Sequence, residues 1–134
     1  MLSARELKVF YGVIQGLKGV DIDIHDREIV TLIGSNGAGK TSTLNGIVNL
    51  VRSTGRVNFL NEDISRSQTH QIVRKGLALV PEGRRIFTNL TIEENLRMGA
   101  YNNLAGFPRL CDRMYSLFPR LKERRTQMAG TMSG

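Results

Sequence analysis

The sequence predicts an α/β fold that continues into a mainly helical segment. Apolar patterns with the period of a strand alternate with patterns typical of a helix, and a glycine-rich turn joins an apolar run to one of these helices. The single cysteine excludes a disulfide-stapled scaffold. The N-terminus has no apolar signal region, and no apolar run approaches the roughly 20 residues of a membrane span. We therefore expect a soluble, cytosolic chain.

The first third of the chain predicts strands that lead into a helix. Residues 7–11 and 20–24 alternate apolar and polar side chains, as half-buried strands do. Residues 28–33 are almost continuously apolar and β-branched, which is typical of a parallel strand covered on both faces. A helix over residues 40–49 follows the glycine-rich turn. Its apolar stripe is expected to consist of Leu44, Ile47 and Val48.

The middle of the chain repeats the alternation. Residues 55–60 predict a short strand, and residues 68–75 predict a helix that Gly76 stops. Residues 77–80 have the composition of another buried strand, which Pro81 ends because proline cannot donate to a ladder.

The last third predicts helices. Thr91 and Glu94 form a capping box that opens a helix reaching Met98 or Tyr101. The remainder, to about Arg125, is expected to be helical in two pieces that are broken near Pro119.

The glycine-rich turn carries the clearest chemical signal. Gly34–Thr41 matches the pattern G-x-x-x-x-G-K-[ST] without a mismatch, between an apolar strand and a helix. Such a loop turns consecutive N–H groups inward as an anion nest, and the following helix directs its positive end at the same place. Lys40 adds a cation for the β- and γ-phosphates, and the Thr41 hydroxyl is a hard oxygen ligand suited to Mg²⁺. The sequence therefore predicts a nucleoside-triphosphate-binding loop.

Two further residues are placed where a nucleotide could be contacted. Tyr11 ends the first strand and could stack on a purine, although a half-buried strand aromatic is the more frequent role of such a residue. Glu82 follows the predicted strand at 77–80, at the end where such sheets meet their ligands, although a solvated loop acid is the alternative.

The net charge of +7 comes mostly from the second half of the chain. A basic surface can serve nucleic acid, an anionic membrane or a phosphate ligand, or balance acidic segments elsewhere. Nucleic-acid binding is not expected, because no binding fold or interleaved aromatics accompany the charges. The cluster Arg120–Arg125 is interpreted as a solvated helix face, with contact to a membrane partner as the main alternative. Cys111 is expected to be an inert thiol.

Taken in order, these motifs resemble the nucleotide-binding subunit of ABC transporters, most closely the branched-chain amino-acid uptake type. Tyr11 matches the adenine-stacking aromatic, Gly34–Thr41 with Ser42 the Walker A loop, and Glu82 the Q-loop position, where most of the superfamily has Gln. Met132–Gly134 resembles the opening of the signature motif, usually Leu-Ser-Gly-Gly-Gln. Three further stretches resemble the subfamily in order and spacing: Val80–Phe87, Leu90–Leu96 and Leu117–Leu121.

This resemblance implies a P-loop NTPase core with an N-terminal antiparallel β-subdomain and the start of a helical subdomain, which is incomplete. Residues 1–134 would be a partial nucleotide-binding domain: residues 1–80 the β-subdomain and part of the core, residues 81–134 the Q-loop and helical subdomain. It implies ATP and Mg²⁺ as cofactors, with Thr41 and Glu82 at the metal. The expected nucleotide contacts are Tyr11, Gly34, Ser35, Asn36, Gly37, Ala38, Gly39, Lys40, Thr41, Ser42, Glu82, Ser133 and Gly134.

The resemblance also implies partners and a location. These are a second nucleotide-binding subunit and transmembrane permease subunits, which would hold the chain at the cytoplasmic face of the membrane. Walker B, the catalytic glutamate and the switch histidine follow the signature in this family, and the sequence contains no match to them. We therefore expect ATP binding without a catalytic residue in this chain, and hydrolysis that requires the missing half. The alternatives are a nucleotide-binding fragment without hydrolysis and a soluble, non-transport ABC-type ATPase.

The absence of the Walker B strand has a consequence for stability. Residues 28–33 would expose an unpaired apolar edge, which is a known aggregation hazard. We expect the isolated chain to be marginally stable, oligomeric or dependent on other protein.

Overall fold

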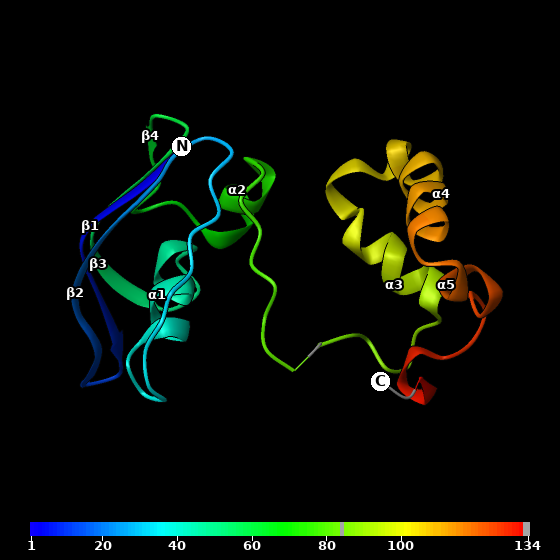
Figure 1. Cartoon of the computed structure of the whole chain (residues 1–134), viewed down its shortest axis with the longest axis horizontal. Coiled ribbons are helices and arrows are strands. Elements are labelled where there is room, and N and C mark those ends of the chain that lie inside the picture. Colours follow the sequence, from blue (N-terminus) through cyan, green and yellow to red (C-terminus); the bar gives the residue numbers. More distant parts are fainter. Residues whose placement is uncertain (84, 133–134) are drawn as a thin grey trace. The chain divides into compact units, whose positions relative to one another are not determined.

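The computed structural model describes residues 1–83 and 85–132, so Arg84, Ser133 and Gly134 lie outside the description. The chain forms two compact units, Met1–Leu79 and Val80–Gly134 (Figure 1). We describe each unit by itself.

An antiparallel sheet organises the first unit. Its strands are β1 (Leu2–Tyr11), β2 (Ile14–Ile24), β3 (Arg52–Phe59) and β4 (Glu62–Asp63), in the spatial order β2-β1-β3-β4. Strand β1 buries Leu2 and Ala4, then Leu7 and Val9, because a register shift between Ala4 and Leu7 changes the phase of the alternation. The strands predicted at residues 7–11, 20–24 and 55–60 are therefore confirmed.

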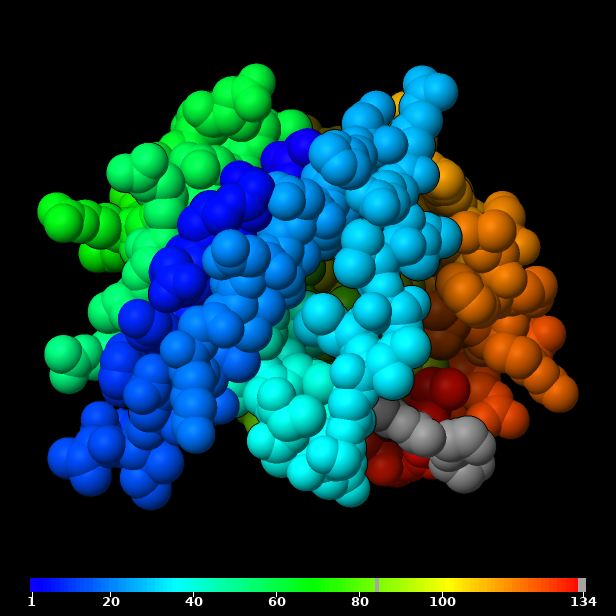
Figure 2. Space-filling model, turned by 60° about the vertical axis from the view of Figure 1, so that its left-hand side comes forward, coloured from blue at the N-terminus to red at the C-terminus, as the bar shows by residue number. Residues whose placement is uncertain are grey.

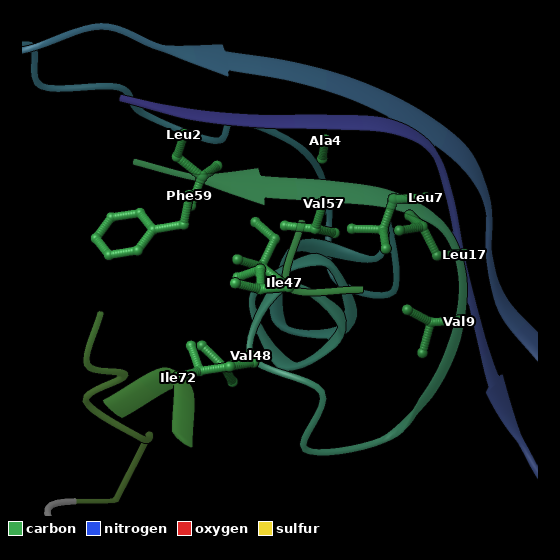
Figure 3. Packing of buried hydrophobic residues seen from close by; sticks show 11 residues of the cluster. Leu2, Ala4, Leu7, Val9, Leu17, Ile47, Val48, Val57, Phe59 and Ile72 are labelled. Carbon is green, nitrogen blue, oxygen red and sulfur yellow. The ribbon is translucent and has the colours of Figure 1, made fainter. Parts of the chain in front are cut away.

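Two helices of this unit lie on the same side of the sheet, α1 (Lys40–Ile47) and α2 (Thr69–Arg74) (Figure 1). Figure 3 shows Ile47 and Val48 of the α1 end, and Ile72 of α2, among the buried side chains of the strands. Gly46 brings α1 close to β1, because a Cβ at this position would lie 2.6 Å from Val9 Cγ2. Leu44 is exposed, so the predicted apolar stripe is wrong at this residue, while Ile47 and Val48 are buried as predicted.

Two predicted strands do not form. Residues 28–33 and 77–80 have no regular secondary structure, because no neighbouring strand pairs with either segment in the described part of the chain. Ile29 and Ile33 are 95% and 93% exposed, and Figure 2 shows the light-blue to cyan segment that contains them at the surface. Leu77 and Leu79 still pack against the core of the first unit. These segments are apolar, but strand formation also requires hydrogen-bond partners.

The second unit is helical. Its elements are α3 (Ile92–Gly99), the 3₁₀ segment η1 (Tyr101–Gly106), α4 (Phe107–Leu117), α5 (Pro119–Glu123) and η2 (Ala129–Thr131). The predicted capping box is confirmed, since Thr91 Oγ1 accepts from Glu94 N at 3.2 Å and Thr91 N donates to the Glu94 carboxylate at 2.8 Å. The predicted break near Pro119 separates α4 from α5.

Cys111 and Tyr115 are both buried in α4. Burial raises the pKa of the Tyr115 phenol, with the neighbouring Cys111 as a further cause. The buried location of Cys111 agrees with an inert thiol.

Candidate functional site

The glycine-rich loop, residues 34–41, follows the exposed segment 28–33, and its last two residues, Lys40 and Thr41, begin helix α1. Gly37 and Gly39 have φ values of +86° and +91°, in the left-handed region that favours glycine. A Cβ on Gly39 would also lie 2.9 Å from Leu17 Cδ1 and 3.4 Å from the Gly16 carbonyl oxygen. The end of the loop is therefore seated directly on strand β2, and no residue with a side chain fits there without a shift.

Lys40 directs its ammonium group back into the loop. Its Nζ donates to the Gly34 carbonyl at 2.7 Å and to the Ser35 carbonyl at 2.8 Å. Ala38 N donates to Ser35 O at 3.2 Å, which closes the turn. A compact cation thus lies at the centre of a loop whose following helix presents its positive end nearby, an arrangement that suits a phosphate group.

Helix α1 is anchored at the loop by Thr43, a buried polar residue. Thr43 N and Thr43 Oγ1 both bond to the Gly39 carbonyl, at 2.8 and 2.9 Å. The first turn of the helix is therefore hydrogen-bonded to the last glycine of the loop. These bonds fix the positions of Lys40, Thr41 and Ser42 relative to the loop.

The donor set fits Mg²⁺ only together with a nucleotide. Within residues 1–83 and 85–132, no group of three or more His, Cys, Asp or Glu side chains could hold a metal. Mg²⁺ usually keeps several waters and binds through few protein ligands plus substrate phosphates. The exposed Thr41 hydroxyl, next to Lys40, meets that requirement as one protein oxygen.

Tyr11 reaches the same helix turn from the sheet. It ends β1, is 43% exposed, and its phenol donates to Ser42 Oγ at 3.2 Å. Tyr11 and Ser42, two of the expected nucleotide contacts, are thus in direct contact. The ring is partly accessible, as an aromatic must be to stack on a base.

Asn49 is an organising residue that the sequence patterns did not single out. Its Nδ2 donates to the carbonyls of Ile64, Ser65 and Ser67 at 2.8, 3.2 and 3.0 Å. The backbone carbonyl of Asn49 accepts a hydrogen bond from Thr69 Oγ1 at 3.0 Å. These bonds join the end of α1 to the start of α2 and so support the helix that carries Lys40.

Glu82 belongs to the second unit, in an exposed loop. Asn95 of α3 holds the segment that follows. Its Oδ1 accepts from Phe87 N at 2.9 Å, and its Nδ2 donates to the carbonyls of Phe87 and Thr91 at 3.0 and 2.9 Å. Asn95 was not recognised from the sequence, because a single polar residue inside a helix has no distinctive pattern.

The chain that leads to Met132 runs beside this segment. Ile92 N donates to Gln127 O at 3.1 Å, Ala129 N to Leu90 O at 2.9 Å, and Gly130 N to Thr88 O at 3.1 Å. These bonds link the segment after Glu82 to the segment before the expected signature. Ser133 and Gly134, which were also expected to contact nucleotide, lie outside the described residues.

The basic cluster Arg120–Arg125 begins in α5 and continues past the end of this helix at Glu123, and it is partly paired within its own unit. Arg120 forms an ion pair with Glu123 at 2.9 Å, and Arg125 lies 3.8 Å from the Glu93 carboxylate. The side chains are exposed, as expected of a solvated helix face.

Comparison with known proteins identifies the family. The profile described as "ABC transporter" matches residues 17–134. The chain is 43% identical, over its whole length, to the high-affinity branched-chain amino acid transport ATP-binding protein BraG of Pseudomonas aeruginosa. The chain belongs to the ABC transporter family. It is also 33% identical, again over its whole length, to the probable branched-chain amino acid transport ATP-binding protein LivF of Archaeoglobus fulgidus.

Solved structures of this family share the fold. An ATP-binding subunit of an ABC transporter matches 99% of the chain with a TM-score of 0.82 and 27% identity, and the chain covers 56% of it. An ATP-binding cassette in a dimeric post-hydrolysis state matches 99% of the chain with a TM-score of 0.79 at 21% identity, and the chain covers 63% of it. The expected fold class, a partial ABC ATPase domain, is confirmed.

The ABC chain described here spans 58% of the length of BraG and of LivF. In the part of the chain that the structure describes, every helix is too short or too polar to cross a bilayer.

Proposed function

We propose that this ABC chain is part of the ATP-binding subunit of a transporter that takes up branched-chain amino acids. The observation that carries the proposal is the loop 34–41, with Lys40 Nζ held by the Gly34 and Ser35 carbonyls at the start of α1. The names of BraG and LivF, both branched-chain amino acid transport proteins, support the substrate class.

Different residues bind the phosphates, the adenine and the metal ion of Mg²⁺–ATP. The loop N–H groups and Lys40 bind the β- and γ-phosphates, because they supply aligned donors and a positive charge. Ser42 and the remaining loop residues complete the phosphate contacts, and the Tyr11 ring stacks on the adenine. Thr41 would hold Mg²⁺ through its hydroxyl oxygen, and the ion would neutralise charge on the phosphates when bound.

The second unit supplies the contacts that respond to the bound nucleotide. Glu82 would supply a carboxylate oxygen to Mg²⁺ or its waters, and Ser133 and Gly134 would contact the nucleotide of a second subunit. Permease subunits bind the Glu82 loop and the helices that follow it, which places the protein at the cytoplasmic face of the membrane.

Hydrolysis draws on residues beyond the 134 of this chain. A general base must lie within hydrogen-bond reach of the attacking water, and the sequence contains no match to the family's catalytic glutamate or switch histidine. Multiple turnovers of ATP by a species whose intact mass equals that of this 15.0 kDa chain would refute this part of the proposal.

Uptake measurements test the transport function. Deleting the gene should lower the uptake of labelled leucine, isoleucine and valine, and the wild-type gene should restore it. The Lys40→Ala gene should not restore it, whereas a gene with Lys18→Ala, at an exposed lysine of β2, serves as the matched control and should. Unchanged uptake of all three amino acids after deletion would overturn the proposed substrate class.

A further inference from the structure

Tyr11, Gly16 and the first turn of α1 meet at one point of the first unit. The Tyr11 phenol donates to Ser42 Oγ at 3.2 Å. A Cβ on Gly16 would lie 2.8 Å from Tyr11 Cε2, 2.9 Å from Tyr11 Cδ2 and 3.4 Å from Ser42 Oγ. The aromatic ring therefore lies across Gly16, and only the absence of a side chain there leaves room for it.

The same glycine contacts the phosphate loop. Its carbonyl oxygen lies 3.4 Å from the position of a Cβ on Gly39, the last residue before Lys40. Gly16 of β2 therefore lies close both to the Tyr11 ring and to the end of the loop. The Tyr11 side chain, with its ring against Gly16 and its hydroxyl bonded to Ser42, has little rotational freedom before any ligand arrives.

We propose that Ser42 and Gly16 are positioning residues for Tyr11, which fix the aromatic at a set distance from the phosphate loop. Ser42 holds the phenol through its hydroxyl, and Gly16 provides the space that the ring occupies. The ligand selected by this arrangement is a nucleoside triphosphate, whose base and phosphates must reach both places at once, over a polyphosphate without a base. The inference rests on the proposed ATP-binding function.

The first test compares two ligands on the full chain. Tyr11→Phe keeps the aromatic ring and removes only its hydroxyl group. It should weaken ATP binding by about two- to tenfold, the loss typical of one neutral hydrogen bond, and leave the affinity for inorganic tripolyphosphate unchanged. Tyr101→Phe, which removes a phenol from the exposed Tyr101 of η1, is the matched control and should change neither affinity.

A mutant cycle then assigns the effect to Ser42. In a Ser42→Ala background, Tyr11→Phe should cause no further loss of ATP affinity, because its partner is already absent. The cycle cancels any contact that Ser42 itself makes with a phosphate. Ser42→Thr retains the hydroxyl and should restore the sensitivity to Tyr11→Phe.

A second cycle tests the space above Gly16. Gly16→Ala should lower ATP affinity in the wild-type background and have no effect in a Tyr11→Ala background, where no ring opposes the new methyl group. Independent effects in either cycle, or equal losses for ATP and tripolyphosphate in Tyr11→Phe, would overturn the inference. A wild-type protein that binds neither ligand would instead contradict the proposed function.

Discussion

At the scale of single residues, the side chains of Lys40, Asn49 and Asn95 act through hydrogen bonds to backbone carbonyls. Gly34–Thr41 follows a contiguous pattern whose chemistry is encoded in adjacent residues, and Lys40 points into the loop as that pattern requires. Asn49 and Asn95 act through bonds to carbonyls that are distant in sequence or that belong to irregular segments. No local sequence pattern predicts such hydrogen bonds, because the donor and its carbonyl partners become neighbours only in the folded chain.

Asn49 gives a prediction at this scale. Asn49→Ala should lower the free energy of unfolding by about 1–3 kcal/mol, because three carbonyls lose their shared donor. The measurement is denaturant unfolding followed by circular dichroism.

Two further variants separate the possible causes of that loss. Asn49 has a positive φ of 52°, so Asn49→Gly removes the amide without the backbone cost and should still destabilise the protein. Asn45→Ala, on α1, is the matched control. Equal stability of Asn49→Gly and the wild type would show that the side-chain bonds contribute nothing.

At the scale of elements, local signals predicted helices better than strands. The helix that begins after Thr91 is encoded by a reciprocal cap between residues three apart, and it forms where expected. Residues 28–33 and 77–80 have strand composition, but a strand is completed only by hydrogen bonds to a neighbour. Their sequence could predict that they are apolar and extended, and could not supply the partner.

The cap of α3 predicts a pH dependence. Hydrogen bonds from the Thr91 backbone and side chain lower the pKa of Glu94 below its ordinary value of 4.5. The carboxylate therefore stabilises the folded state above pH 4.5, and this contribution is lost as the pH falls through the lower, folded-state pKa.

Stability measured against pH checks the sign. The wild type should be more stable than Glu94→Gln at neutral pH, and the difference should shrink as acid protonates the carboxylate. Glu123→Gln, which alters an exposed surface ion pair, is the control. A difference between wild type and Glu94→Gln that grows on acidification would contradict the assignment.

The unpaired segment 28–33 predicts self-association. Ile29 is 95% exposed within an apolar run that forms no strand, and an exposed apolar segment favours association between chains. Ile29→Lys should reduce the fraction of oligomer in gel filtration, whereas Leu60→Lys, at another exposed apolar residue, should not. A wild-type protein that elutes only as a monomer would show that this segment is harmless.

At the scale of the whole molecule, family membership follows from the order of short motifs along the chain. The two units each hold some of them: the loop and Tyr11 lie in the first, and Glu82 with the segment leading to Met132 lies in the second. The sequence alone predicted the partial ABC fold because these motifs are local and ordered. Two features could be seen only in three dimensions. Leu77 and Leu79 pack against the core without strand hydrogen bonds, and the loop lies close to Gly16.

The proposed function requires the loop 34–41 to bind the phosphates of ATP through Lys40. Equilibrium titration with ATP, of the wild type, Lys40→Ala and the control Lys18→Ala, measures this binding directly. Lys40→Ala should weaken ATP binding by at least about tenfold, since a charge-assisted contact is lost, while Lys18→Ala should bind ATP as the wild type does. Equal affinity of Lys40→Ala and the wild type for ATP would contradict this requirement.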